Sequence, residues 1–222
     1  MKFTLGARLM AEFIGTAFLV ASVVGSGIMG ERLAGGNVAI ALLANTIATG
    51  AALVALIAAL GSISGAHFNP VVTLSEAITG GLSWTDAGAY AAVQIVGGIG
   101  GALVAHLMFG LAIVSLSLHA RQGLSIVFSE FIATFGLLMV ILGCSRSRPS
   151  MVPVAVGSYI TAAYWFTAST SFANPAVTIA RSLSNTFVGI RLVDVPLFLV
   201  AQVCGGLAAT LLFSRFKHSP AG

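Results

Sequence analysis

Two matching stretches decide the fold: Asn69-Pro70-Val71-Val72-Thr73 and Asn174-Pro175-Ala176-Val177-Thr178. Proline is favoured in the first turn of a helix, because the amide that it lacks would have no partner there. Asparagine directly before proline is a strong N-cap, since its side-chain oxygen accepts a hydrogen from a backbone amide. Each stretch therefore predicts the start of a helix.

Charged residues are too scarce for a soluble domain. Of the 222 residues, 58% are hydrophobic and only 7% are Asp, Glu, Lys or Arg. A soluble domain has about 25% charged residues. Most of this surface must therefore face a lipid bilayer, and we expect an integral membrane protein. The basic residues behind the net charge of +4 form no patch, so we expect no nucleic-acid partner.

The runs between charged residues predict six membrane-spanning helices, each of which needs about 20 residues. Two runs, 33–75 and 149–180, are too long for one span and too short for two. Each leaves a surplus of about 10 residues, or about 15 Å of helix, and each surplus contains one Asn-Pro pair. We therefore predict a re-entrant half-helix in both. The excess of run 87–120, which lacks such a pair, is assigned to a loop; the other runs are 9–30, 122–145 and 195–214.

The two halves of the chain repeat. Two further signatures recur in the same order as the Asn-Pro stretches: residues 11–16 as 129–134, and residues 94–98 as 202–206. We divide the single domain, residues 1–222, into repeats 1–120 and 121–222. Because three spans per repeat is an odd number, the second copy enters the membrane from the opposite face. The predicted fold is an all-α membrane protein with six transmembrane helices, two re-entrant half-helices and an inverted repeat.

Basic residues beside short loops favour cytoplasmic termini, because such residues are more frequent on the cytoplasmic side. Six would then lie inside and four outside. The inside set is Lys2, Arg8, Arg146, Arg148, Arg215 and Lys217, and the outside set is Arg32, Arg121, Arg181 and Arg191.

The inverted repeat is expected to bring Asn69 and Asn174 face to face at the centre of the bilayer. Each half-helix would direct an amino terminus worth about +0.5 charge toward this point. We expect the side-chain NH2 of each asparagine to remain free to donate a hydrogen bond. Such a site would pass neutral molecules with oxygen lone pairs and repel cations and protons.

Two carboxylates, Glu12 and Glu130, fall inside predicted spans, where a charged group is a candidate functional site. The alternative is that each braces the re-entrant loop of its own half by accepting backbone amide hydrogens. We favour bracing, because the pair is symmetric and no cation lies in the spans. Gln94 and Gln202 are interpreted as helix-packing or loop-bracing groups.

His67 could be a metal ligand, a pH sensor or a residue that lines the cytoplasmic mouth of a pore. No second His or Cys stands at ligand spacing, so we favour the pore-lining role and predict no metal site. Neither His106 nor His119 belongs to a recognisable group of candidate site residues. Cys144 and Cys204 lie in or beside apolar runs and are interpreted as buried structural thiols.

A family resemblance rests on three elements: the residues Ser64-Gly65-Ala66-His67-Phe68-Asn69-Pro70, then Val72-Thr73-Leu74, and later Asn174-Pro175-Ala176. Together they resemble the aquaporin, or major intrinsic protein, family. The resemblance implies a right-handed six-helix bundle, a homotetramer with one pore per subunit, and a place in the plasma (inner) membrane. It implies no cofactor. It also implies that Gly65, Ala66, His67 and Phe172 line the pore beside the Asn-Pro motifs.

Two positions depart from the family pattern. Val71 stands where the family usually has alanine, and Val177 stands where it usually has arginine. By family spacing the other constriction positions are Thr49, Ser171 and either Ala162 or Tyr164; we favour Tyr164. Valine lacks the bulk, the charge and the five donors of arginine. We therefore expect a mouth that is wider, less hydrophilic and no longer positively charged.

The sequence resembles the aquaglyceroporins of bacterial arsenic-resistance operons, which pass arsenite as the neutral trihydroxide. This implies a passive channel for water, glycerol and neutral metalloid acids, and larger organoarsenicals are a further expectation. The alternative is an ion-coupled secondary transporter, for which Glu12 and Glu130 are the available midplane groups. A structural junction protein and an anion channel fit less well. An enzyme is not expected, because no nucleophile, base and orienting group converge.

Overall fold

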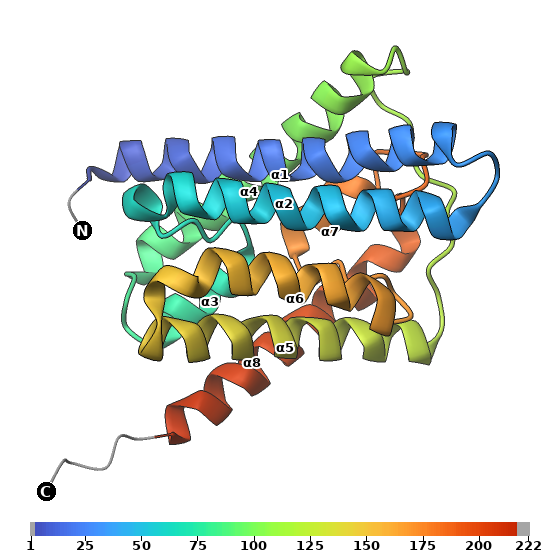
Figure 1. Cartoon of the computed structure of the whole chain (residues 1–222). Coiled ribbons are helices and arrows are strands. Elements are labelled where there is room, and N and C mark those ends of the chain that lie inside the picture. Colours follow the sequence, from blue (N-terminus) through green and yellow to red (C-terminus); the bar gives the residue numbers. More distant parts are fainter. Residues whose placement is uncertain (1–2, 217–222) are drawn as a thin grey trace, which may run out of the picture.

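The computed structural model describes residues 3–216, and within them the chain forms a helical bundle (Figure 1). Eight α-helices and two 3-10 turns are present in this part of the chain. Helices α1, α2, α5 and α6 run side by side, α4 and α8 are inclined to them, and two short helices lie inside the bundle. The elements are α1 (Leu5–Leu33), α2 (Val38–Ser64), α3 (Pro70–Ile78), α4 (Trp84–Met108), α5 (Leu124–Ser147), η1 (Pro149–Met151), α6 (Val152–Phe166), α7 (Pro175–Arg181), η2 (Leu192–Asp194) and α8 (Val195–Arg215).

Five of these helical segments are long and apolar enough to cross a membrane. The sixth predicted span is α6, which has 15 residues and so is only about 22 Å long. It starts late because Pro149 and Pro153 favour a helix start over a helix interior; the 3-10 turn η1 fills the gap between α5 and α6. As predicted, the excess of run 87–120 is a loop, which follows α4.

Both Asn-Pro stretches open the predicted half-helices, α3 with 9 residues and α7 with 7 residues. The two enter from opposite ends of the bundle and meet inside it (Figure 1). Below, the "α3 end" and the "α7 end" name these two ends. Helix α1 starts and α8 ends at the α3 end (Figure 1). Lys2 and Lys217, which contribute to the predicted orientation, lie outside the described residues.

Glycines allow the long helices of each half to cross closely. A Cβ atom at Gly97 of α4 would collide with the carbonyl oxygen of Phe13 in α1. In the second half, a Cβ at Gly205 of α8 would collide with the carbonyl oxygen of Phe131 in α5. Small residues permit such backbone contacts between helices in lipid. The matched pairs show the internal repeat at the level of packing.

The prediction of buried cysteine thiols is wrong for Cys204, which is exposed on the outer surface of α8, and Cys144 is only partly buried. Both belong to helices of the lipid-facing bundle. In a membrane protein, apolar neighbours in the sequence are found on lipid-facing surfaces as well as in the protein core. They therefore do not predict that a cysteine is buried inside the protein.

Candidate functional site

Asn69 and Asn174 tie the two re-entrant loops together. The side-chain nitrogen of Asn69 donates to the carbonyl oxygen of Ala173 at 2.7 Å, and that of Asn174 donates to the carbonyl oxygen of Phe68 at 2.8 Å. Their side-chain oxygens cap the half-helices, by accepting the amide hydrogen of Val71 in α3 and of Ala176 in α7. Each asparagine thus joins the start of its own helix to the loop of the other half.

The prediction that each asparagine NH2 is free needs a correction. One of its two hydrogens is used in the bond across to the other loop. Both side chains nevertheless line the central cavity. The second hydrogen of each NH2 is the one that remains for a passing molecule.

Both loops contain non-glycine residues in the left-handed backbone region at matched positions. Ala66 and Phe68 have φ angles of 50° and 48°, and Ser171 and Ala173 have 50° and 47°. Such conformations cost free energy, on the order of 1–3 kcal/mol each, unless the surroundings impose them. The surroundings here include a buried carboxylate for each loop.

Glu12 binds the first loop from within α1. Its carboxylate accepts hydrogen bonds from the amides of His67 and Phe68, at 3.0 and 2.7 Å, and from the hydroxyl of Ser64 and the amide of Gln94. Glu12 is fully buried. All four of these hydrogen bonds connect Glu12 to the first loop or to residues that pack against this loop.

Glu130 makes the equivalent contacts in the second half. It accepts from the amides of Phe172 and Ala173, both at 2.9 Å, and from the side chain of Gln202 at 2.6 Å. Gln202 also donates to Thr178, as Gln94 does to Thr73 in the first half. The two braces are therefore built from the same residue types.

A cavity of about 320 Å³ runs past the meeting point of the loops. It is lined from both ends, by Ser145 and Glu76 toward the α3 end and by Arg181 toward the α7 end. Ten of the predicted site residues line it: Thr49, Gly65, Ala66, His67, Asn69, Tyr164, Ser171, Phe172, Asn174 and Val177.

Four of the predicted pore-centre residues do not line this cavity: Pro70, Val71, Pro175 and Ala176. Val71 instead packs toward α8, where a Cβ atom at Gly206 would collide with its Cγ1 methyl group. The valine that replaces the usual alanine is thus accommodated by a glycine on the neighbouring helix. Its effect on the cavity is indirect.

Thr49 and Tyr164 both line the cavity, and their hydroxyl groups form a hydrogen bond with each other at 3.3 Å. Ala162, the other candidate for this position, lines a separate groove on the outer surface between α2 and α6. Val177 is buried and lines the same cavity. The hydroxyl oxygen of Ser171 is buried and has no hydrogen-bond partner within residues 3–216, so it is available to a molecule in the cavity.

His67 lines the cavity, and its Nδ1 lies 3.0 Å from the hydroxyl of Thr73. His106, which the sequence assigns to no group of site residues, is buried and has a structural role. Its ring nitrogens lie 2.8 Å from the carbonyl oxygen of Ile113 and 2.8 Å from the hydroxyl of Ser184. It joins the end of α4 to the loops of the α7 end.

The prediction of an uncharged mouth is wrong for this cavity, because Arg181 lines it. Arg181 is four residues after Val177 in the same half-helix, and residues at this spacing share a helix face. The four-residue spacing between Val177 and Arg181 could therefore have indicated from the sequence that Arg181 lines the cavity. From the sequence, Arg181 is interpreted only as a basic residue flanking a loop on the outer side. Arg121 lies nearby on the loop after α4, with its guanidinium donating to the carbonyl oxygen of Ser169 at 3.1 Å.

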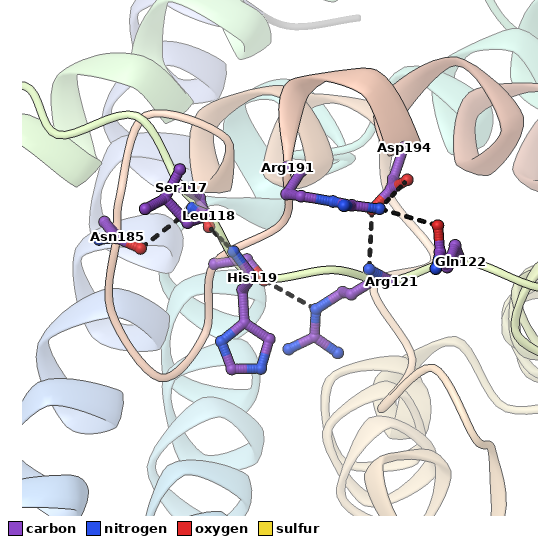
Figure 2. A network of polar contacts seen from close by, with 9 residues as sticks. Ser117, Leu118, His119, Arg121, Gln122, Asn185, Arg191 and Asp194 are labelled. Atoms are coloured by element: carbon purple, nitrogen blue, oxygen red, sulfur yellow. Dashed lines mark hydrogen bonds and ion pairs between the residues drawn. The ribbon is translucent and has the colours of Figure 1, made fainter.

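A polar network holds the loops of the α7 end (Figure 2). The amide of Arg121 donates to Asp194 at 2.8 Å, and the guanidinium of Arg191 pairs with the same carboxylate. The side chain of Asn185 accepts the amide of Leu118. Burial acts to raise the pKa of Asp194, but the hydrogen bonds from Arg191 and the Arg121 amide outweigh it and lower that pKa.

Comparison with known proteins agrees with this geometry. Residues 2–171 match the family described as major intrinsic protein. The chain is 52% identical to the aquaglyceroporin AqpS of Rhizobium meliloti, over 99% of this chain and 94% of that protein. It is 32% identical to aquaporin NIP1-4 of rice, over 98% and 79% respectively. The solved aquaglyceroporin of Plasmodium falciparum has the same fold, with a TM-score of 0.77 at 18% identity, covering 96% and 97% of the two chains.

Two capped half-helices that meet beside a cavity inside an apolar helical bundle, together with these similarities, define a membrane channel and not an enzyme. The chain belongs to the major intrinsic protein family.

Proposed function

We propose that the protein is a passive channel for small uncharged solutes, namely water, glycerol and neutral metalloid acids such as arsenite. The observation that carries the proposal is the cavity where Asn69 and Asn174 meet. Their remaining amide hydrogens can bind the oxygen atoms of a solute while both half-helix amino termini repel cations. The name of the relative AqpS, an aquaglyceroporin, supports glycerol among the solutes.

Selectivity among these solutes is proposed to lie at Thr49, Tyr164, Ser171 and Val177, all of which line the cavity. Valine at position 177 leaves more room than a longer side chain, so the proposal includes polyols and arsenicals larger than arsenite. The hydroxyl groups of Thr49, Tyr164 and Ser171 supply hydrogen bonds to a polyol.

Stopped-flow light scattering on proteoliposomes tests the proposal, with water, glycerol and arsenite compared in one preparation. We expect flux of all three above that of protein-free vesicles. Val177→Arg should reduce glycerol and arsenite flux by about tenfold or more while water still passes, because the new side chain occupies the cavity. Unchanged glycerol flux in a folded Val177→Arg protein would contradict the constriction assignment.

An ion-coupled secondary transporter remains the alternative. It needs a midplane carboxylate that binds and releases an ion. Glu12 and Glu130 are fully buried and accept the amide hydrogens of the re-entrant loops, so release of either carboxylate would disrupt its loop. This geometry favours the channel.

The proposal also includes a homotetramer in the plasma (inner) membrane with both termini cytoplasmic, and a role in arsenic resistance. The support is the family resemblance and the similarity to a bacterial aquaglyceroporin. Mass measurement of the detergent-solubilised protein tests the tetramer. Cysteine labelling from either side of intact cells tests the orientation, at single cysteines added beside Phe3 or in the loop after α4 of a variant in which Cys144 and Cys204 are replaced by serine.

A further inference from the structure

Two contacts hold the side chain of Arg181, which lines the cavity. It is the last residue of α7, one helical turn after Val177, and its side chain is 2% exposed. Its guanidinium carbon lies 3.3 Å from the centroid of the Phe172 ring, a stacked arrangement. Its Nε donates to the carbonyl oxygen of Val188. The plane of the guanidinium is therefore fixed on one side by the ring and at one nitrogen by the backbone.

The two terminal nitrogens of Arg181 have no hydrogen-bond partner within the part of the chain that the structure describes. The residue lines the cavity, so these donors are available there. A buried guanidinium with unused donors is costly unless water or a solute satisfies it. The structure thus leaves a strong hydrogen-bond donor facing the solute path.

Arg121 adds a second positive charge at the same ring. Its guanidinium carbon lies 4.9 Å from the centroid of Phe172, and its Nε donates to the carbonyl oxygen of Gly189 at 2.7 Å. Burial lowers the pKa of Arg121 to about 10, so the group remains charged at neutral pH. The ring of Phe172 thus carries guanidinium groups from two separate segments of the chain.

Of the carboxylates near this place, Asp194 and Glu130 are already engaged, and the third is the exposed Glu31 near the end of α1. Asp194 pairs with Arg191, and Glu130 accepts the loop amides of Phe172 and Ala173. The imidazole of His119 points in the same direction as the Arg121 guanidinium (Figure 2). Burial, followed by the positive charges of Arg121 and Arg181, lowers the pKa of His119. The field at the α7 end of the cavity is therefore positive.

A second buried polar group lines the same cavity as the arginine. The hydroxyl oxygen of Ser171 is also without a partner in residues 3–216, and it lines the cavity next to Phe172. Together, Ser171 and Arg181 offer a hydroxyl group and two guanidinium nitrogens to a molecule in the cavity. Neutral molecules rich in oxygen atoms match this set.

We propose that Arg181 is the residue that determines specificity at the α7 end: its guanidinium binds the oxygen atoms of neutral solutes and repels cations, including hydronium. The inference deepens the proposed channel function and rests on it. Because Arg181 lies one turn beyond Val177, the positive charge stands at the rim of the cavity while the valine keeps its narrower part open. Charge selection and size selection are thus carried by different residues.

Arg181→Leu, which removes the charge, tests the proposal in proteoliposomes that contain a pH-sensitive dye. We expect the proton leak to rise by about tenfold or more, because a desolvated charge beside a pore is a large barrier to cations. The double variant Val177→Arg/Arg181→Leu should restore cation exclusion. A folded Arg181→Leu protein with normal water flux and no added leak would overturn the proposal.

Arg181→Lys provides a second test of the proposal if the Arg181→Leu variant does not fold. Lysine retains the charge but loses the planar stack and the fork of donors. We expect intact cation exclusion with reduced glycerol flux. Cation leak in this variant at normal water flux would also contradict the proposal. A wild-type protein that passes neither water nor glycerol would contradict the channel function itself. A wild-type protein that passes both, with Arg181 variants that behave in the same way as it does, would contradict only the role of Arg181.

Discussion

The side-chain nitrogen of Asn174 lies 2.8 Å from the carbonyl oxygen of Phe68, 106 residues earlier in the chain. Asn69 makes the reciprocal bond to Ala173. Each asparagine thus caps its own half-helix and holds the opposite loop, so helix start, loop position and cavity wall depend on the same two side chains.

Asn174→Ala should therefore destabilise the protein more than the loss of an ordinary cap. Losing a cap costs about 1 kcal/mol, and losing a buried hydrogen bond costs about 1 kcal/mol more. The matched control is Asn37→Ala, which removes the exposed cap of α2 and no bond to a second loop. Thermal unfolding in detergent should show the larger fall in melting temperature for Asn174→Ala; equal shifts would contradict the double role.

Glu130→Gln should lower the folded yield sharply. Hydrogen bonds to a charged group contribute about 1.5–3 kcal/mol each, and the carboxylate accepts three. A carboxamide has one acceptor oxygen, and its NH2 would face other donors. The control is Glu31→Gln, at an exposed position near the end of α1. Size-exclusion chromatography of the purified variants provides the readout, and a monodisperse Glu130→Gln protein of wild-type stability would rule out the brace.

Gly206→Ala should destabilise the contact between α8 and α3, because the added methyl collides with Val71. Overpacking of this kind costs about 1–3 kcal/mol. The double variant Val71→Ala/Gly206→Ala should recover most of the loss, since it moves the methyl from one side of the contact to the other. Absence of recovery in melting experiments would show that Val71 is not the obstacle.

The Asp194 contact should make stability depend on pH at the α7 end. Its pKa is lowered in the folded protein, so its contribution is present above the unfolded pKa of about 3.9 and is lost as the pH falls through the lower, folded value. Asp194→Asn should thus lower the melting temperature at pH 7 by an amount that shrinks below about pH 4. A difference that is the same at pH 7 and pH 3 would contradict this linkage.

The half-helices and the braces were predictable because they rest on local rules and on repetition. Asparagine before proline caps a helix, and a charge-free run of one and a half spans leaves no other arrangement in a bilayer. Glu12 and Glu130 were found as a pair because their surroundings repeat along the chain.

The rest depended on contacts between distant segments. The sequence does not show that each Asn NH2 is partly used by the other loop, that Val71 faces Gly206, or that Cys204 faces outward. The sequence counts Arg181 only as a basic residue flanking a loop on the outer side of the membrane; its burial against Phe172 depends on a contact that the sequence does not show. The short α6 follows from two prolines whose effect depends on where the preceding helix ends.

The most direct test of a passive pore through the Asn69–Asn174 meeting point is the initial rate of glycerol entry as a function of its concentration. It should be measured in proteoliposomes of the wild-type protein, with and without a pH gradient. A passive channel predicts a rate that rises linearly with concentration and does not change when the gradient is imposed or collapsed. A rate that saturates and follows the gradient would contradict the channel and support the coupled transporter.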